Sequence, residues 1–168
     1  FNPLYPIGDQ IGEVLQLHRG MHKAAAWHAA GALLEQVGIA DTARRMQSFP
    51  HQLSGGQRQR AMIAMALAGE PELLIADEPT TALDVTLQAQ IMALISELQH
   101  ERKMAVLLIT HDLNLVCDFA DHVAVMHQGK IVETAPASDL FAAPHMAYTR
   151  ELLASRVARL ADMEAASD

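Results

Sequence analysis

The sequence predicts an α/β fold, in which a parallel sheet with flanking helices is joined to a smaller α-helical subdomain. Two apolar runs, Leu73–Ala76 and Met104–Thr110, predict buried strands. Between them, apolar residues at helical spacing predict a helix over residues 87–99. The order strand, helix, strand is typical of parallel strands joined by right-handed crossovers. The helical spacing of apolar residues over residues 9–52 predicts the helical subdomain.

The helical subdomain is expected to hold three helices. Apolar residues recur at helical spacing over residues 9–18 and 22–37, and Gly38 provides a stop for the second helix. Asp41 is expected to cap a short third helix that runs to Met46.

A fourth helix, rich in alanine and methionine, is expected over residues 57–68. Arg58 and Arg60 are expected to face solvent or neighbouring carboxylates. The packed side of this helix is expected to comprise Met62, Ile63, Met65, Ala66 and Leu67.

Past the second strand, the sequence predicts a helix, a β-hairpin and two closing helices. Gln128-Gly129 is the turn signal of the hairpin. The expected elements are a helix over residues 113–119, strands over 122–127 and 130–135, and helices over 137–141 and 147–161.

Composition limits the class of protein. The formal net charge of −8, without a cluster of Lys and Arg, argues against a nucleic-acid partner. No apolar stretch approaches the roughly 20 residues that cross a bilayer. The single cysteine, Cys117, excludes an internal disulfide and is expected to be a small buried side chain. His18 and His22 have no further ligand at metal-site spacing, so we expect them to be exposed.

The start of the fourth helix has the chemistry of an anion site. Ser54 is a natural N-cap, and Gly55 and Gly56 allow backbone N–H groups to approach a ligand closely. Gln57 follows and opens the helix. A helix N-terminus with exposed amides carries a partial positive charge, which favours phosphate.

Polar side chains follow both predicted strands. Asp77 and Glu78 come directly after the first strand, between Pro71 and Pro79, and His111 follows the second. Ligands of open α/β sheets bind at the carboxyl ends of the strands. These three side chains are therefore candidates for a shared site.

Together these motifs resemble a known family. LSGGQ at residues 53–57, LLIADEP at 73–79 and TALD at 81–84, followed by His111, resemble the signature motif, Walker B strand, D-loop and H-loop of ATP-binding cassette (ABC) ATPases. The segment Pro144–Thr149 is similar to the His-Pro-Tyr-Thr tail of oligopeptide and dipeptide importer ATPases. The resemblance implies a P-loop NTPase-type sheet, with ATP as the substrate and Mg²⁺ as the cofactor.

The resemblance also implies roles for individual residues. Asp77 would hold Mg²⁺ through water, Glu78 would be the general base, and His111 would steady the attacking water. The residues expected to contact the nucleotide or line the interface with a second nucleotide-binding domain are Ser54, Gly55, Gly56, Gln57 and Asp84.

Partners follow from the same resemblance. Catalysis would require a second nucleotide-binding domain, because the signature motif closes over ATP held by the partner. Membrane permease subunits would receive the motion, and a solute-binding protein would act indirectly. The implied role is to power import of peptides or related small solutes, at the cytoplasmic face of the cell membrane.

The Gly-rich loop that cradles phosphates, G-x-x-x-x-G-K-[ST], does not occur in these residues. The only Gly-Lys pair, Gly129-Lys130, lacks the preceding glycine and the following Ser or Thr. We therefore expect a partial domain that is inactive alone. We expect a helical subdomain with the signature motif over residues 1–70, core strands over 71–135 and a helical tail over 136–168.

Two other functions fit the same motifs. An ABC ATPase of DNA repair or chromosome maintenance also carries signature and Walker B motifs, although the acidic charge argues against it. A non-catalytic fragment that docks on a partner is the other alternative, against which Glu78 argues because a degenerate site often loses this base.

Overall fold

The structure, a computed structural model, describes residues 1–81 and 83–155. The chain divides into two compact units, Phe1–Leu107 and Leu108–Asp168. We describe each unit by itself. Across the described residues, the helices are too short or too polar to cross a membrane.

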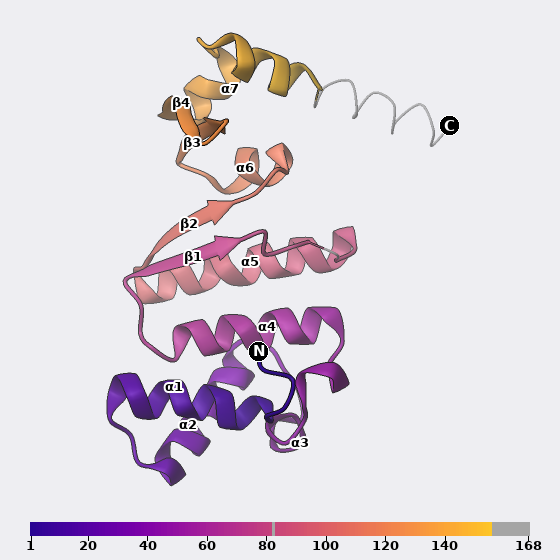
Figure 1. Ribbon diagram of the computed structural model, residues 1–168, viewed down its shortest axis with the longest axis vertical. Helices are drawn as coiled ribbons and strands as arrows, with labels where there is room; N and C mark the ends of the chain where they lie inside the picture. Colours follow the sequence, from indigo (N-terminus) through magenta and orange to yellow (C-terminus); the bar gives the residue numbers. More distant parts are fainter. Residues whose placement is uncertain (82, 156–168) are drawn as a thin grey trace. The chain divides into compact units, whose positions relative to one another are not determined.

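The first unit begins with the predicted helical subdomain (Figure 1). It comprises α1 (Ile7–Arg19), α2 (Lys23–Gln36), α3 (Thr42–Met46) and a 3₁₀ turn, η1 (Pro50–Gln52). The three expected helices are confirmed. Asp41 holds the N-cap position of α3, but in a left-handed conformation and without a side-chain capping bond. Apolar side chains of α1 and α2 form the core of this subdomain: Ile7, Ile11, Leu15, Ala26, Ala30 and Leu34.

The fourth helix, α4 (Gly55–Leu67), packs through a different face from the one expected. Its buried residues are Gly56, Ala61, Ile63, Ala64 and Leu67. The expectation was therefore wrong for Met62 and Ala66, which are exposed, whereas the smaller Ala61 and Ala64 are buried.

The two arginines of α4 donate to backbone carbonyls. Arg58 is exposed, as expected, whereas the half-buried Arg60 departs from the expectation. Arg60 Nη1 donates to the Val37 carbonyl oxygen at 2.7 Å, and Arg58 Nη2 donates to that of Leu53 at 3.4 Å. Carbonyls at the end of a helix lack intrahelical partners, so the guanidinium of Arg60 satisfies one just past α2.

The predicted strand, helix and strand follow as β1 (Leu73–Asp77), α5 (Val85–Arg102) and β2 (Ala105–Ile109). β1 and β2 are hydrogen-bonded neighbours, and their arrows run in the same direction in Figure 1. The Ala105 N–H donates to the Glu72 carbonyl oxygen at 2.8 Å beside the start of both strands. The parallel sheet is therefore confirmed.

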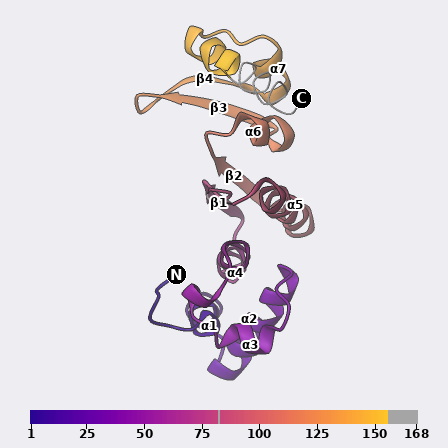
Figure 2. The ribbon, with the colours of Figure 1, turned by 90° about the vertical axis from the view of Figure 1, so that its right-hand side faces the viewer.

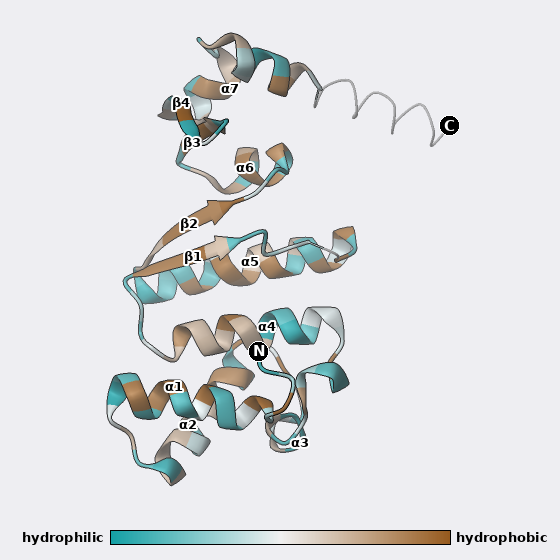
Figure 3. Ribbon diagram, viewed as in Figure 1, coloured by the Kyte–Doolittle hydropathy of each residue, from teal (hydrophilic) through white to brown (hydrophobic). Residues whose placement is uncertain are grey.

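Burial of β1 differs from the expectation. Both strands are apolar up to Asp77, the last residue of β1 (Figure 3), yet only Leu74 and Ala76 of β1 are buried. Leu73 is 48% exposed and Ile75 is 60% exposed, since they point to the opposite face. Within the described residues, α5 lies along one side of the two strands (Figure 2), so only that face is covered.

The second unit contains α6 (Leu113–Phe119), the hairpin strands β3 (His122–His127) and β4 (Lys130–Pro136), and α7 (Ala137–Ala142). The hairpin is antiparallel, as predicted, with a bulge between Val125 and Met126. Its turn residues Gln128 and Gly129 have φ values of 48° and 74°. This left-handed pair matches the twist of the strands.

Two further expectations concern this unit. Residues 147–155 are helical, and the remainder of the helix expected over 147–161 lies outside the described residues. Cys117 is exposed, so its expected burial was wrong. It lies on α6, where only Leu115 is buried.

Candidate nucleotide site

The N-terminus of α4 is closed by a reciprocal capping box, which confirms Ser54 as the N-cap. The Gln57 N–H donates to Ser54 Oγ at 3.3 Å, and the Ser54 N–H donates to Gln57 Oε1 at 3.2 Å. The side chains of Ser54 and Gln57 thus satisfy each other's backbone amides. The helix start is formed by its own residues and needs no ligand to fold.

The capping box leaves the amides of the two glycines for a ligand. The first four N–H groups of a helix have no intrahelical partner, and the capping box supplies partners for those of Ser54 and Gln57. Gly55 is exposed and Gly56 is buried. An anion that approaches this end would meet amide donors and the positive end of the helix dipole.

The carboxylates of Asp77 and Glu78 lie at the end of β1, where the backbone turns sharply. Asp77 is the last residue of β1 and is exposed. Glu78 has a φ of 49°, so the strand ends there and the chain turns. A left-handed non-glycine residue is uncommon and indicates a tightly specified turn. Glu78 therefore does not continue the strand alternation that its position suggests.

Thr81 orients the Glu78 carboxylate. Thr81 Oγ1 donates to Glu78 Oε2 at 2.9 Å, and the Thr81 N–H donates to the Glu78 carbonyl oxygen at 3.2 Å. Two bonds to one residue restrict both the side chain and the backbone of Glu78. A carboxylate held in this way is suited to position a water molecule.

Asp84 caps α5. Its Oδ1 accepts a hydrogen bond from the Leu87 N–H at 2.9 Å. The aspartate is exposed, so one carboxylate oxygen can serve the helix while the other meets a partner.

His111 belongs to the second unit, where it follows β2 and is exposed. The segment around it is ordered by local bonds. The Asp112 N–H donates to Thr110 Oγ1 at 3.0 Å, and Asp112 Oδ1 caps α6 by accepting from the Asn114 N–H at 2.9 Å. The first unit thus contains the signature residues with Asp77, Glu78 and Asp84, and the second unit contains His111.

Mg²⁺ prefers oxygen ligands. The residues that the structure describes contain no cluster of three or more His, Cys, Asp or Glu side chains that could hold a metal by themselves. A site built from one carboxylate, water and substrate phosphates is nevertheless the usual arrangement for Mg²⁺. The exposed Asp77 carboxylate fits that role.

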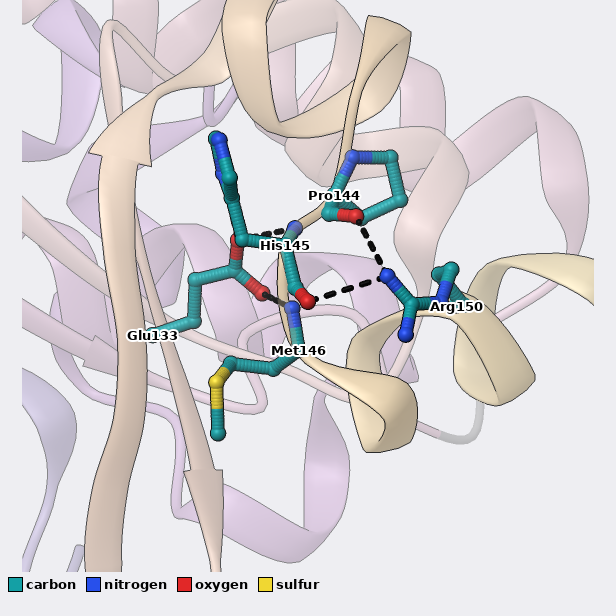
Figure 4. Close-up of polar contacts among 5 residues, drawn as sticks. All are labelled: Glu133, Pro144, His145, Met146 and Arg150. Carbon is teal, nitrogen blue, oxygen red and sulfur yellow. Dashed lines mark hydrogen bonds and ion pairs between the residues drawn. The ribbon is translucent and has the colours of Figure 1, made fainter.

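Sequence reasoning missed a polar cluster in the second unit (Figure 4). The Glu133 carboxylate accepts the N–H groups of His145 at 2.8 Å and Met146 at 3.1 Å. Arg150 Nη1 donates to the carbonyl oxygens of Pro144 and His145 from the other side. Glu133 thereby ties the turn before residue 147 to β4. The signal in the sequence is weak, because Glu133 shares its strand with two other polar residues, Lys130 and Thr134.

The cluster lowers the pKa of Glu133. The largest contribution comes from the Thr149 hydroxyl, which is buried beside the carboxylate without the geometry of a full hydrogen bond. The backbone bonds from His145 and Met146 and the charge of His145 lower the pKa further, while burial opposes them. Each of these donors favours the ionised form.

Comparisons with known proteins identify the family to which the sequence is similar. The sequence profile of the ABC transporter family matches residues 6–81. The peptidoglycan transport ATP-binding protein YejF of Agrobacterium fabrum is 56% identical over 92% of this chain and 28% of its own length. A Brucella melitensis protein, BMEII0863, named for peptide import and ATP binding, is 55% identical over 96% of this chain and 47% of its own.

A solved structure is similar in both sequence and fold. The ATP-binding cassette MJ0796, in a dimeric post-hydrolysis state bound to ADP and Pi, is 31% identical with a TM-score of 0.69. The match covers 80% of this chain and 58% of that one.

This parallel α/β unit, with a signature-type helix start and a strand-end carboxylate pair, is similar to solved ATP-binding cassettes. Residues 6–81 belong to the ABC transporter family, and the relatives that the chain matches include ATP-binding proteins named for peptide import. It spans between 28% and 47% of the length of the two curated relatives described above.

Proposed function

We propose that this chain is part of an ATP-binding and ATP-hydrolysing subunit that powers an ABC importer of peptides or related small solutes. One observation carries the proposal. The signature helix start and the turn after the Asp77-Glu78 pair lie in one unit, with the side chain of Leu83 directly beside Gly55. A phosphate-binding helix start and a water-orienting carboxylate are both needed for phosphoryl transfer to water.

Each site residue then has a chemical task. Asp77 would hold Mg²⁺, which when bound neutralises charge on the β- and γ-phosphates. Glu78, oriented by Thr81, accepts a proton from the attacking water. His111 contacts the γ-phosphate and steadies that water.

The second nucleotide-binding domain supplies the other half of each site. The dimeric state of the related cassette MJ0796, with ADP and Pi, supports this arrangement. In the pair, the amides at Gly55 and Gly56 close over a nucleotide held by the partner, and Asp84 lies at the interface. ATP favours the closed pair and hydrolysis releases it, so nucleotide acts as a population switch.

Membrane permease subunits are the recipients of this motion, and the subunit sits at the cytoplasmic face of the membrane. A solute-binding protein is an indirect partner, because it delivers solute to the permease. The relatives named for peptide import and peptidoglycan transport support this class of cargo. The formal charge of −8 gives no support to a nucleic-acid partner.

The decisive experiment compares Glu78→Gln with the wild type, in a form extended upstream to the length of the Brucella relative (the extended protein). Glutamine keeps the shape and can still accept from Thr81, but it cannot take a proton. We expect hydrolysis to fall by about 10²–10⁴-fold with ATP binding retained.

Glu72→Gln is the matched control. Glu72 is an exposed acid just before β1, and its substitution should leave both quantities unchanged. Wild-type rates in Glu78→Gln would remove Glu78 from its role as base. An extended protein that neither binds nor hydrolyses ATP would overturn the function itself.

A further inference from the structure

Two leucines occupy the space beside the signature glycines. A Cβ atom added at Gly55 would lie 3.4 Å from Cδ2 of Leu83, and one added at Gly56 would lie 3.2 Å from Cδ2 of Leu87. The second distance is tighter than ordinary van der Waals contact. Gly56 therefore allows α4 and α5 to approach closely, because it has no side chain.

Leu83 precedes α5 and Leu87 lies in its first turn, and hydrogen bonds hold these two segments together. Gln88 Nε2 donates to the carbonyl oxygens of Leu83 at 3.3 Å and Thr80 at 3.4 Å. The Leu83 N–H donates to the Thr80 carbonyl oxygen at 3.2 Å, and Thr80 is only 5% exposed. The first turn of α5 is thus tied to the segment that follows β1.

This segment includes the residues that orient Glu78. Thr81, the neighbour of buried Thr80, donates to the Glu78 carboxylate. A continuous set of contacts therefore runs from Gly56 through Leu87 and the α5 start to Glu78. All of these residues lie in the first unit.

We propose that Leu87 is a positioning residue that keeps the signature helix start in register with Glu78. The proposal rests on the proposed function. A shift of α4 away from α5 would move the amides that face a partner's nucleotide, whereas a shift of the turn would move the base. The Leu87 side chain lies 3.2 Å from the position of a Gly56 Cβ and projects from the first turn of α5, which Asp84 caps and Gln88 ties to Thr80, so this side chain links the α4 start to the turn that holds Glu78.

The test is a double-mutant cycle of Gly56→Ala and Leu87→Ala in the extended protein. We expect each single substitution to lower kcat for ATP hydrolysis and to leave KM for ATP nearly unchanged, because each acts on the closed pair. In the double variant, the added methyl group enters the space that the leucine leaves. Its kcat should exceed the product of the two single effects by at least about threefold.

Controls separate positioning from general stability. Ile91→Ala removes a fully buried side chain one turn further along α5, so it should lower Tm without changing kcat per folded molecule. Leu87→Met should retain kcat, since methionine fills a similar volume.

The outcomes are distinct. If the single effects on kcat multiply, Gly56 and Leu87 act independently and the inference is wrong. Coupling in Tm without coupling in kcat would reduce the contact to packing and would also overturn it. Absence of ATPase activity in the wild type would instead defeat the proposed function, and this inference with it.

Discussion

The start of α4 and the Glu133 cluster show two ways in which a protein satisfies polar groups near a helix start. At α4, Ser54 and Gln57 cap the helix from within, and the adjacent glycine amides are left for a ligand. Near residue 147, Glu133 reaches across from β4 and takes the amides of His145 and Met146 itself. The start of α4 therefore has amides that can bind an external anion, whereas the amides before residue 147 already bind the Glu133 carboxylate.

This difference predicts that nucleotide binds at the start of α4 and not at the Glu133 cluster. The largest expected effect is the difference in ATP affinity between the 168-residue chain and the extended protein. The chain of 168 residues has anion-binding amides but no Gly-rich loop to anchor the β-phosphate. We expect it to bind ATP only weakly and to hydrolyse it negligibly, as isothermal titration calorimetry and phosphate release would show. The extended protein is the control. Micromolar affinity of the unextended chain would contradict the prediction.

Stability should respond next, through the cap of α4. Ser54→Ala removes the acceptor of the Gln57 N–H, so we expect a loss of about 1 kcal/mol in the free energy of unfolding. Urea denaturation measures this. Ser138→Ala is the control, because the exposed Ser138 hydroxyl only contacts its neighbour Asp139 and caps no helix. Equal losses in the two variants would mean that the capping box does not hold α4.

Substitutions at Asp84 separate its effect as the N-cap of α5 from the effect of its negative charge. Asp84→Asn keeps an N-cap acceptor for the Leu87 N–H, so we expect stability within about 0.5 kcal/mol of the wild type, whereas Asp84→Ala should lose about 1 kcal/mol. If the carboxylate charge also serves the interface between two nucleotide-binding domains, Asp84→Asn in the extended protein should lower the ATPase rate at unchanged Tm. A wild-type rate would restrict Asp84 to capping.

Local chemistry explains what the sequence predicted well. The α4 cap depends on Ser54 and Gln57, three residues apart, and the hairpin turn depends on the adjacent Gln128 and Gly129. Such features need no knowledge of the rest of the fold, because the interacting groups are neighbours in the chain.

Features that depend on packing between elements escaped the prediction. The exposure of Leu73 and Ile75 reflects which faces of β1 are covered, and an apolar run cannot reveal that. The contact of Leu87 with Gly56 depends on how closely α4 and α5 approach. Glu133 and His145 are 12 residues apart, and their bond forms only once the hairpin and α7 are in place.

The smallest effect at neutral pH concerns Glu133, whose influence appears only on acidification. Its folded-state pKa lies below the ordinary value of 4.5, chiefly through the Thr149 hydroxyl and the His145 amide. A lowered pKa contributes stability that is complete above the unfolded-state value and is lost as pH falls through the folded-state value. Hydrogen exchange at the His145 and Met146 amides should therefore stay slow near neutral pH and lose protection below about pH 4.5.

Glu133→Gln tests the assignment, because glutamine can still accept an N–H but does not titrate. In that variant, protection at both amides, measured relative to their intrinsic exchange rates, should no longer depend on pH in the acidic range. His145 is the other titratable group in contact, with Nδ1 3.5 Å from Glu133 Oε1, so His145→Asn is the parallel control. If His145→Asn abolishes the acidic transition and Glu133→Gln does not, the imidazole governs the turn. In that case the pH dependence that distinguishes this turn from α4, whose capping box contains no titratable group, would not come from the Glu133 carboxylate.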